Sequence, residues 1–167
     1  MEKGCDNVGK ESKTNAMRKL DSMKIEYREH IYEPDSSLSG TDIAALLGED
    51  IKRVYKTLVT VGKSGGHYVF MIPVEKELDL KKAASSVGEK SVSMVKSKEL
   101  LGLTGYIHGG CSPIGMKKLF KTTVDESAKA QNRIFCSGGR IGLQIELSPH
   151  DLEKVVPISY AAITADQ

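Results

Sequence analysis

A histidine and a cysteine lie three positions apart in the segment HGGCSPIGMKK, residues 108–118. Cys111 could serve as a nucleophile, as a metal ligand or as a small packing group. A nucleophilic thiol needs a base within hydrogen-bond reach and a third group that orients this base, and the sequence shows neither. In a strand that runs into a Gly-Gly turn, the His108 ring and the thiol need not face each other. We therefore expect Cys111 to pack as a small buried residue, as free cysteines often do.

The cysteines and histidines do not form a metal-binding pattern. Cys5, Cys111 and Cys136 include no CxxC pair, and the four histidines show no HExxH spacing, although zinc sites usually present their ligands at such short spacings. An odd number of cysteines also argues against a disulfide framework. We expect no metal and no cofactor, and we expect Cys136, which follows Phe135 in a predicted strand, to be buried.

Lys56 is the charged residue with the least ordinary surroundings. Strand alternation in RVYKTLVT, residues 53–60, places Lys56 on one face together with Val54 and Leu58. Burying an ammonium group among apolar side chains is costly unless it meets a cavity, an anion or a carboxylate. The alternative is an edge lysine whose stem packs while its ammonium group reaches water. Since most lysines are solvated, the residue pattern alone favours this alternative.

Two loops contain a Gly-Gly pair at the end of a predicted strand. They are HGGCSPIG, with Gly109 and Gly110, and CSGGRIG, with Gly138 and Gly139. Paired glycines can turn their N–H groups toward one point and admit a phosphate or a carbonyl oxygen without steric hindrance. One such loop is usually an ordinary turn, but two similar loops favour a site.

Lysine and arginine residues recur near the ends of the predicted elements. A cluster of them around the glycine loops would bind phosphate groups, with an affinity that falls steeply with salt. Only 5% of the residues are aromatic and there is no tryptophan, which argues against a stacking platform for single strands. The residues concerned are Lys52, Arg53, Lys81, Lys82, Lys96, Lys98, Lys117, Lys118, Lys121 and Arg140.

Length and composition favour one domain. A chain of 167 residues that is 40% hydrophobic can bury one sizeable core, and its net charge of +2 excludes a globally basic surface. No run approaches the roughly 18 apolar residues that a membrane span needs, and the start lacks the apolar core of a signal peptide. We expect a soluble, cytoplasmic protein with a disordered leader at residues 1–13 and one domain at residues 14–167.

Hydrophobic periodicity predicts short helices alternating with short strands. Thr41 is expected to cap the second helix and Gly48 to end it, and Ser148 and Pro149 are expected to begin the last helix. The predicted helices cover residues 14–24, 41–48, 78–88, 97–102, 125–131 and 148–155. The predicted strands cover residues 25–32, 53–61, 67–74, 91–95, 104–110, 118–124, 133–139 and 141–147.

Strands and helices of such irregular spacing argue against a doubly wound parallel sheet. We predict a mixed α/β (α+β) fold, a single domain in which a curved or barrel-like mixed sheet of about eight strands is surrounded by short helices.

Five sequence blocks, in this order, point to a known family: HIYEPD at 30–35, VYKTLV at 54–59, LDLKKAA at 78–84, TGYIHGGCSPIGMKK at 104–118 and SGGRIGLQIELSPHDL at 137–152. They resemble the YbaK family, the bacterial aminoacyl-tRNA deacylases related to the editing domain inserted in prolyl-tRNA synthetase. The resemblance extends over residues 14–163, and its hallmarks are VYKTL and GGxSPxG.

The resemblance implies a YbaK-type editing fold and the removal of cysteine from tRNA(Pro), with tRNA(Cys) as a further candidate substrate. The thiol of the substrate would attack its own ester, so that the cysteine leaves as a thiolactone. Lys56 matches the family's essential lysine and would polarise the ester or hold the terminal ribose and phosphate. Tyr32 would contact substrate, although a half-buried strand aromatic is the alternative. The remaining implied pocket residues are Gly109, Gly110, Ser112 and Pro113 on one side and Gly138 and Gly139 on the other.

Gln144 departs from the family pattern. Members often carry an aspartate in GLDIEL where this sequence has GLQIEL. If that carboxylate orients the amino group of the substrate, a neutral amide would bind it less strongly, which leaves the amino-acid preference open. The implied partner is tRNA(Pro) charged with cysteine, and prolyl-tRNA synthetase is a candidate partner. Two alternatives stay open: a deacylase for a different small residue such as alanine, and a non-catalytic module that binds tRNA or a synthetase.

Overall fold

The computed structural model describes residues 13–166. The expected disordered leader, residues 1–13, lies outside the described residues apart from Lys13, and so does Cys5. Five α-helices and two 3₁₀ helices fall within this part of the chain. The α-helices are α2 (Asn15–Ser22), α3 (Gly40–Leu47), α4 (Leu80–Val87), α5 (Ser97–Thr104) and α6 (Pro149–Val155), and the 3₁₀ helices are η1 (Ile51–Arg53) and η2 (Glu126–Ala130).

Local sequence signals begin and end most of these helices. Ser148 accepts a hydrogen bond from the Asp151 amide at the start of α6, and Gly48 ends α3 in the left-handed conformation with φ of 68°, as predicted. The prediction that Thr41 caps α3 is wrong. Ser39 is the cap, because its side chain and that of Asp42 form a reciprocal capping box.

Eight strands are described, and they form two sheets rather than one continuous sheet. The small antiparallel sheet has the order β1-β7-β6, and the larger sheet has the order β4-β2-β3-β5-β8, with β3, β5 and β8 parallel to one another. The mixed class is thus confirmed. The strands are β1 (Arg28–Ile31), β2 (Tyr55–Gly62), β3 (His67–Pro73), β4 (Val92–Met94), β5 (Lys121–Asp125), β6 (Ile134–Ser137), β7 (Leu143–Leu147) and β8 (Ile158–Ala161).

Two strand predictions need correction although the number of strands agrees. The strand expected at residues 104–110 is absent: Thr104 ends α5, and the segment after it is an irregular loop in which the Tyr106 hydroxyl donates to the Ile114 carbonyl over 2.6 Å. Sequence reasoning missed β8, a strand of four residues at the edge of the larger sheet that pairs with β5. The expected helix at residues 125–131 is the 3₁₀ helix η2.

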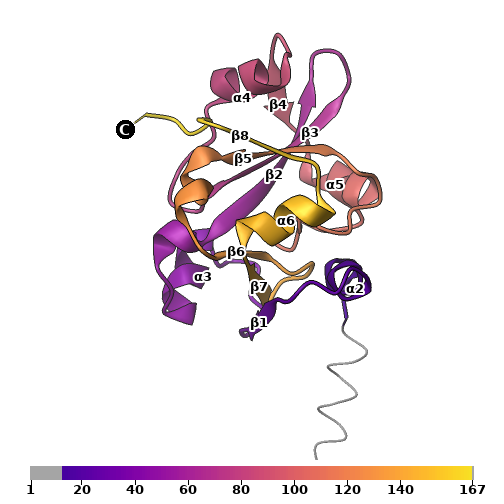
Figure 1. Cartoon of the computed structure of the whole chain (residues 1–167). Coiled ribbons are helices and arrows are strands. Elements are labelled where there is room, and N and C mark those ends of the chain that lie inside the picture. Colours follow the sequence, from indigo (N-terminus) through magenta and orange to yellow (C-terminus); the bar gives the residue numbers. More distant parts are fainter. Residues whose placement is uncertain (1–12, 167) are drawn as a thin grey trace, which may run out of the picture.

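The main core lies between the two sheets, where α2 and α6 also contribute (Figure 1). Leu20 from α2, Leu152 from α6, Met71 from β3 and Ile145 from β7 are each almost fully buried in this core. On the opposite face of the larger sheet, α4 packs against Phe70 and its neighbours.

The two sheets are joined just before β2 by a single parallel bridge between Val54 and Phe135. Phe135 is fully buried and forms a small core cluster with Val54, Val74 and Ala44 of α3. Its ring also contacts the His30 ring, with the centroids 5.0 Å apart. Phe135 thus fixes the position of β2 relative to the small sheet.

We expect Phe135→Ala to lower the free energy of unfolding by about 3–5 kcal/mol, because it removes a buried ring and leaves a cavity. Denaturant unfolding followed by circular dichroism measures this loss. The control is Leu119→Ala, whose side chain is 74% exposed and whose loss should stay below about 0.5 kcal/mol. Equal effects of the two substitutions would contradict the role assigned to Phe135.

Candidate functional site

A cavity of about 270 Å³ lies where the two sheets meet. β2 forms one wall, and the start of α3, the segment from β4 into α5 and the loop that contains His108 form the others. The small sheet contributes Ser137 from β6 and Gln144 from β7, which are directly paired in the sheet. Segments that lie far apart in the chain therefore converge on this cavity.

Lys56 lines the cavity from β2, where it pairs with Ile72 of β3. Its side chain is half-buried, and within residues 13–166 no hydrogen bond or ion pair engages it. A partly desolvated ammonium group without a carboxylate partner attracts anions and polarises carbonyl oxygens more strongly than one in bulk water. The structure thus places Lys56 in the cavity lining with a half-buried side chain, and its functional role stays a prediction.

Two buried oxygen atoms in the cavity lining have no hydrogen-bond partner among the described residues. They are Oε1 of Gln144, whose side chain is almost fully buried, and Oγ1 of Thr57. Leaving a buried polar atom unsatisfied costs about 1–3 kcal/mol. Such atoms are therefore expected to accept hydrogen bonds from a bound molecule. Sequence reasoning missed Thr57, although it follows Lys56 directly within the VYKTL motif.

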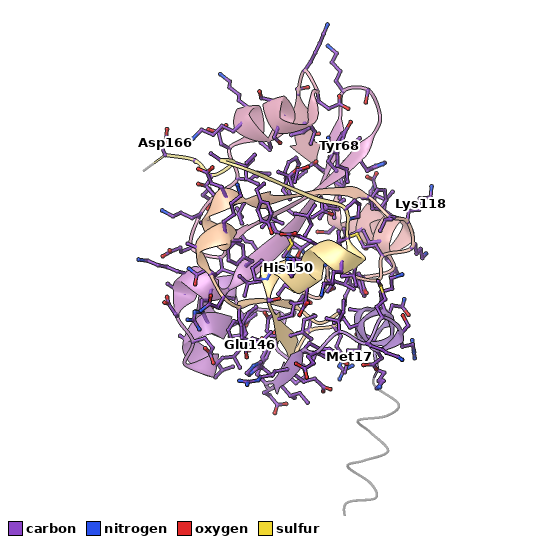
Figure 2. All side chains as sticks on the ribbon, in the orientation of Figure 1. Met17, Tyr68, Lys118, Glu146, His150 and Asp166 are labelled. Carbon is purple, nitrogen blue, oxygen red and sulfur yellow. The ribbon has the colours of Figure 1, made fainter. Side chains whose placement is uncertain are left out.

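A charged network centred on Glu146 lies on the small sheet, two residues along β7 from Gln144; Glu146 is labelled in Figure 2. The carboxylate of Glu146 accepts hydrogen bonds from His30 Nε2 over 2.9 Å and from Arg133 Nε over 3.0 Å. Burial raises the pKa of Glu146, but the two hydrogen bonds and the neighbouring charges outweigh this effect and hold its pKa below the ordinary value. The carboxylate nearest to Gln144 along β7 is thus ionised and already engaged by its own partners.

Cys111 and His108 both line the cavity, but they differ in exposure. Cys111 is buried among Val59, Leu100 and Tyr106, whereas His108 is exposed. Desolvation raises the pKa of the Cys111 thiol to about 11, despite a hydrogen bond with Thr104 that lowers it. The predicted burial of Cys111 is confirmed, and a protonated thiol is a poor nucleophile.

Cys136 is buried as predicted. Burial raises the pKa of its thiol to about 12. It packs in the main core with Ile134 and Ile145, away from the cavity lining.

The two glycine loops lie against each other. A Cβ on Gly110 would come within 2.8 Å of the Arg140 backbone, so this close approach requires glycine. Gly109, with φ of 90°, lines the cavity. Gly138 and Gly139 do not contribute to the lining; a Cβ on Gly138 would overlap the Leu143 side chain.

Three other predicted site residues are buried next to the cavity without lining it. Ser112 is fully buried, and its hydroxyl accepts a hydrogen bond from the Ile114 amide over 3.2 Å. Pro113 is buried beside it. Tyr32 is 7% exposed, and its hydroxyl has no partner among the described residues. Of the predicted residues, Lys56, Gly109 and Gln144 are therefore brought together in the lining.

Sequence reasoning missed the residues that α3 and α5 contribute to the cavity. Gly40 and Ile43 come from α3, and Val95, Ser97 and Leu100 from the segment that leads into α5. Each belongs to an ordinary helical or strand pattern, so only the spatial arrangement identifies them. Within residues 13–166, no three His, Cys, Asp or Glu side chains gather as a metal site would require. The described helices also include none long and apolar enough to cross a membrane.

The chain matches the family profile described as "Aminoacyl-tRNA editing domain" over residues 36–155. It is 44% identical over 158 residues to an Enterococcus faecalis protein, EbsC, named as a candidate Cys-tRNA(Pro)/Cys-tRNA(Cys) deacylase, with 94% of this chain and 96% of that protein covered. It is 30% identical over 117 residues to a proline–tRNA ligase of Thermodesulfovibrio yellowstonii, with 68% of this chain and 20% of the ligase covered.

The fold also agrees with a solved structure. A crystal structure described as that of a candidate trans-editing enzyme for prolyl-tRNA synthetase superposes with a TM-score of 0.79, at 23% identity, and the match covers 91% of this chain and 96% of that one. The five sequence blocks, the profile match and the near full-length relative agree. The chain therefore belongs to the YbaK-type aminoacyl-tRNA editing domain family.

Proposed function

We propose that this protein is a trans-editing aminoacyl-tRNA deacylase that removes cysteine from mischarged tRNA(Pro). The observation that carries the proposal is the half-buried Lys56, unpaired within residues 13–166, in a cavity of a chain 44% identical to a protein named for this activity. Ligand pockets for drug-sized molecules measure about 300–1,000 Å³. A cavity of about 270 Å³ therefore suits the aminoacyl end of a tRNA and not its stem.

The need for such an enzyme follows from the limits of binding selectivity. A binding pocket discriminates by only roughly 10- to 200-fold between two substrates that differ by about one methylene group. A synthetase that accepts proline therefore cannot exclude the slightly smaller cysteine by binding alone, and a second site that removes the wrong product corrects the error.

The proposed chemistry uses the thiol of the substrate as the nucleophile. The cysteine sulfur attacks the carbonyl carbon of its own ester, a C–S bond forms, and the bond from the carbonyl carbon to the ribose oxygen breaks. The proton lost by the thiol ends on that ribose oxygen, which leaves uncharged tRNA and a cyclic thiolactone. Because the nucleophile comes from the substrate, the raised pKa of Cys111 does not hinder the reaction.

Lys56 is assigned the electrostatic role. As the ester is attacked, negative charge develops on its carbonyl oxygen, and a fixed ammonium group stabilises this charge most where water is excluded. From the same position Lys56 would also hold the terminal ribose and its phosphate. This contact would orient the ester for intramolecular attack. No other lysine lies in the described cavity lining.

Gln144 and Thr57 are assigned to the amino group of the substrate. Both present an unpartnered buried oxygen in the cavity lining, and an ammonium group offers three donors. Gly109 and Cys111, which line the cavity, would limit the space available to the side chain of the substrate. Tyr32, Gly110, Ser112, Pro113, Gly138 and Gly139 remain proposed as residues that shape this site from behind the lining.

Gln144 also favours a second candidate function, the deacylation of alanyl-tRNA(Pro). A neutral amide in place of the family's usual aspartate binds the amino group of the substrate less tightly. A site of this kind would suit a different small aminoacyl group. Alanine has no thiol, so water would have to attack its ester. Incubation with Cys-tRNA(Pro) and Ala-tRNA(Pro), followed by identification of the products, separates the two functions. A folded protein that releases neither amino acid would leave only a tRNA- or synthetase-binding role, in which prolyl-tRNA synthetase is the candidate partner.

We expect Lys56→Ala to lower kcat/KM for Cys-tRNA(Pro) at least about 100-fold, the loss typical for removal of one transition-state stabilising group. Single-turnover deacylation measures the loss, and circular dichroism checks that the fold is kept. Lys81→Ala, which changes an exposed lysine of α4, is the matched control and should retain wild-type turnover. Full activity of the Lys56 variant would contradict the proposed function of this cavity.

Cys111→Ser should keep turnover within about threefold of wild type, because the thiol is protonated at neutral pH and has no catalytic role. The same reasoning predicts slow alkylation of Cys111 in a Cys5→Ser background, with a rate that rises about tenfold per pH unit toward the thiol pKa of about 11. Mass spectrometry after timed iodoacetamide treatment measures this rate. Rapid labelling at pH 7 together with an inactive serine variant would instead identify a thiol enzyme.

Gln144→Met should raise KM for Cys-tRNA(Pro) about tenfold while kcat changes little, because it removes a hydrogen bond of comparable strength in the ground state and transition state. Methionine keeps the length of the side chain but cannot accept as an amide does. Gln131→Met, outside the cavity, is the control. A large loss of kcat with unchanged KM would show that Gln144 acts on the reacting ester rather than on the amino group.

A further inference from the structure

We propose that an exposed group of lysines around α5 binds the phosphate backbone of the acceptor stem of tRNA. This α5 lysine surface consists of Lys96, Lys98, Lys117, Lys118 and Lys121, all of them exposed. The proposal rests on the proposed function and extends it from the aminoacyl end, which the cavity holds, to the part of the tRNA that the cavity is too small to admit.

The charge of this surface is strongly one-sided. Between residues 94 and 121 the five lysines are accompanied by a single carboxylate, that of Glu99. Within residues 13–166 none of the five ammonium groups has an ion-pair partner. The whole chain carries a net charge of only +2, so the rest of the chain has a net negative charge and this stretch is its basic part.

Some other basic side chains are engaged by neighbouring groups. Lys82 Nζ lies 3.1 Å from an Asp166 oxygen, Arg133 binds Glu146, and Lys129 lies over the Tyr160 ring. Exposed lysines such as Lys19, Lys63 and Lys81 also have no ion-pair partner among the described residues, but they neither line the cavity nor adjoin its lining in the sequence. What distinguishes the α5 lysines is therefore their position beside the cavity.

The α5 lysine surface adjoins the cavity. Lys96 lies between Val95 and Ser97, which both line the cavity, and Lys98 follows directly. At the other end of α5, the Lys117 amide donates to the Thr104 carbonyl over 3.0 Å. The side chain of Lys118 projects from the surface beside α5 (Figure 2). The lysines thus extend from the cavity wall along the length of α5.

The extent of this surface fits a nucleic-acid backbone. Eight residues of α-helix, as in α5, span about 12 Å, and a nucleic-acid duplex carries roughly one phosphate charge per 1.7 Å of its axis. A stem whose aminoacyl end enters the cavity would therefore place several phosphates opposite the lysines. Contacts of this kind fix the position of the nucleic acid without reading its sequence.

The test compares two triple variants that change the net charge equally. The first variant, Lys96→Ala/Lys98→Ala/Lys117→Ala, removes three of the five lysines of the α5 lysine surface. The second variant, Lys19→Ala/Lys63→Ala/Lys81→Ala, removes three exposed lysines elsewhere. The affinity for uncharged tRNA(Pro) is measured at several salt concentrations. We expect the first variant to bind at least tenfold more weakly and to reduce the slope of log affinity against log salt by about 2 to 3, while the second stays close to wild type. Equal losses in both variants, or no loss in the first, would overturn the proposal.

A second measurement separates the lysine surface from the chemistry of the cavity. The first variant should lose at least tenfold in kcat/KM on Cys-tRNA(Pro) but deacylate a cysteinylated CCA trinucleotide, which has no stem, at the wild-type rate. Equal losses on both substrates would assign the lysines to the cavity and overturn the proposal. If wild-type protein deacylates neither substrate, the proposed function fails. The binding experiment still tests whether the α5 lysine surface binds tRNA. A loss seen only when prolyl-tRNA synthetase is present would identify a protein-docking surface instead.

Discussion

The contact between Val54 and Phe135 is the constraint on which the site depends. It is the one bridge that joins the two sheets in the described chain, and the cavity lies beside it, with walls from both sheets. The buried Phe135 ring fills the space between Val54, Val74 and α3, so β2 cannot approach the small sheet more closely at that point. Lys56 and Gln144 face one cavity because this packing holds their strands at a fixed separation.

The cavity combines apolar packing with polar atoms that the fold leaves unsatisfied. Gln144 Oε1 and Thr57 Oγ1 each cost about 1–3 kcal/mol while no donor meets them, and Lys56 loses part of its hydration. The closely packed core of Leu20, Met71 and Ile145 offsets such costs. Unsatisfied polar groups concentrated in one place are typical of a functional site, where residues are arranged to bind a ligand although this arrangement lowers local stability.

The sequence predicted the local features of this fold better than its long-range ones. The strands β2 and β3, Gly48 as a helix end and Ser148 as a cap follow from short patterns. The loop after Thr104 was mistaken for a strand because its apolar residues pack individually against α5 and β2 rather than pairing in a sheet. The division into two sheets, and the walls from α3 and α5, depend on contacts between residues far apart in the chain, which periodicity does not encode. Lys56 and Thr57 both lie in the VYKTL motif, but only the lysine stands out there, because threonine is an ordinary residue of a strand.

The glycine loops show why residue type alone does not assign a role. The Gly-Gly pairs at 109–110 and 138–139 have the same composition, and both loops lie at the junction of the sheets. Gly109 borders the cavity, but Gly110 is required because the Arg140 backbone passes within 2.8 Å of its missing Cβ, and Gly138 because Leu143 occupies the equivalent space. These glycines therefore serve the site indirectly: by letting the two loops pack without side chains between them, they hold Gly109, Cys111 and Ser137 at one wall. A Cβ at Gly110 would separate the loops and widen the cavity, so the proposed selectivity for a small aminoacyl group would depend on residues that do not line the cavity.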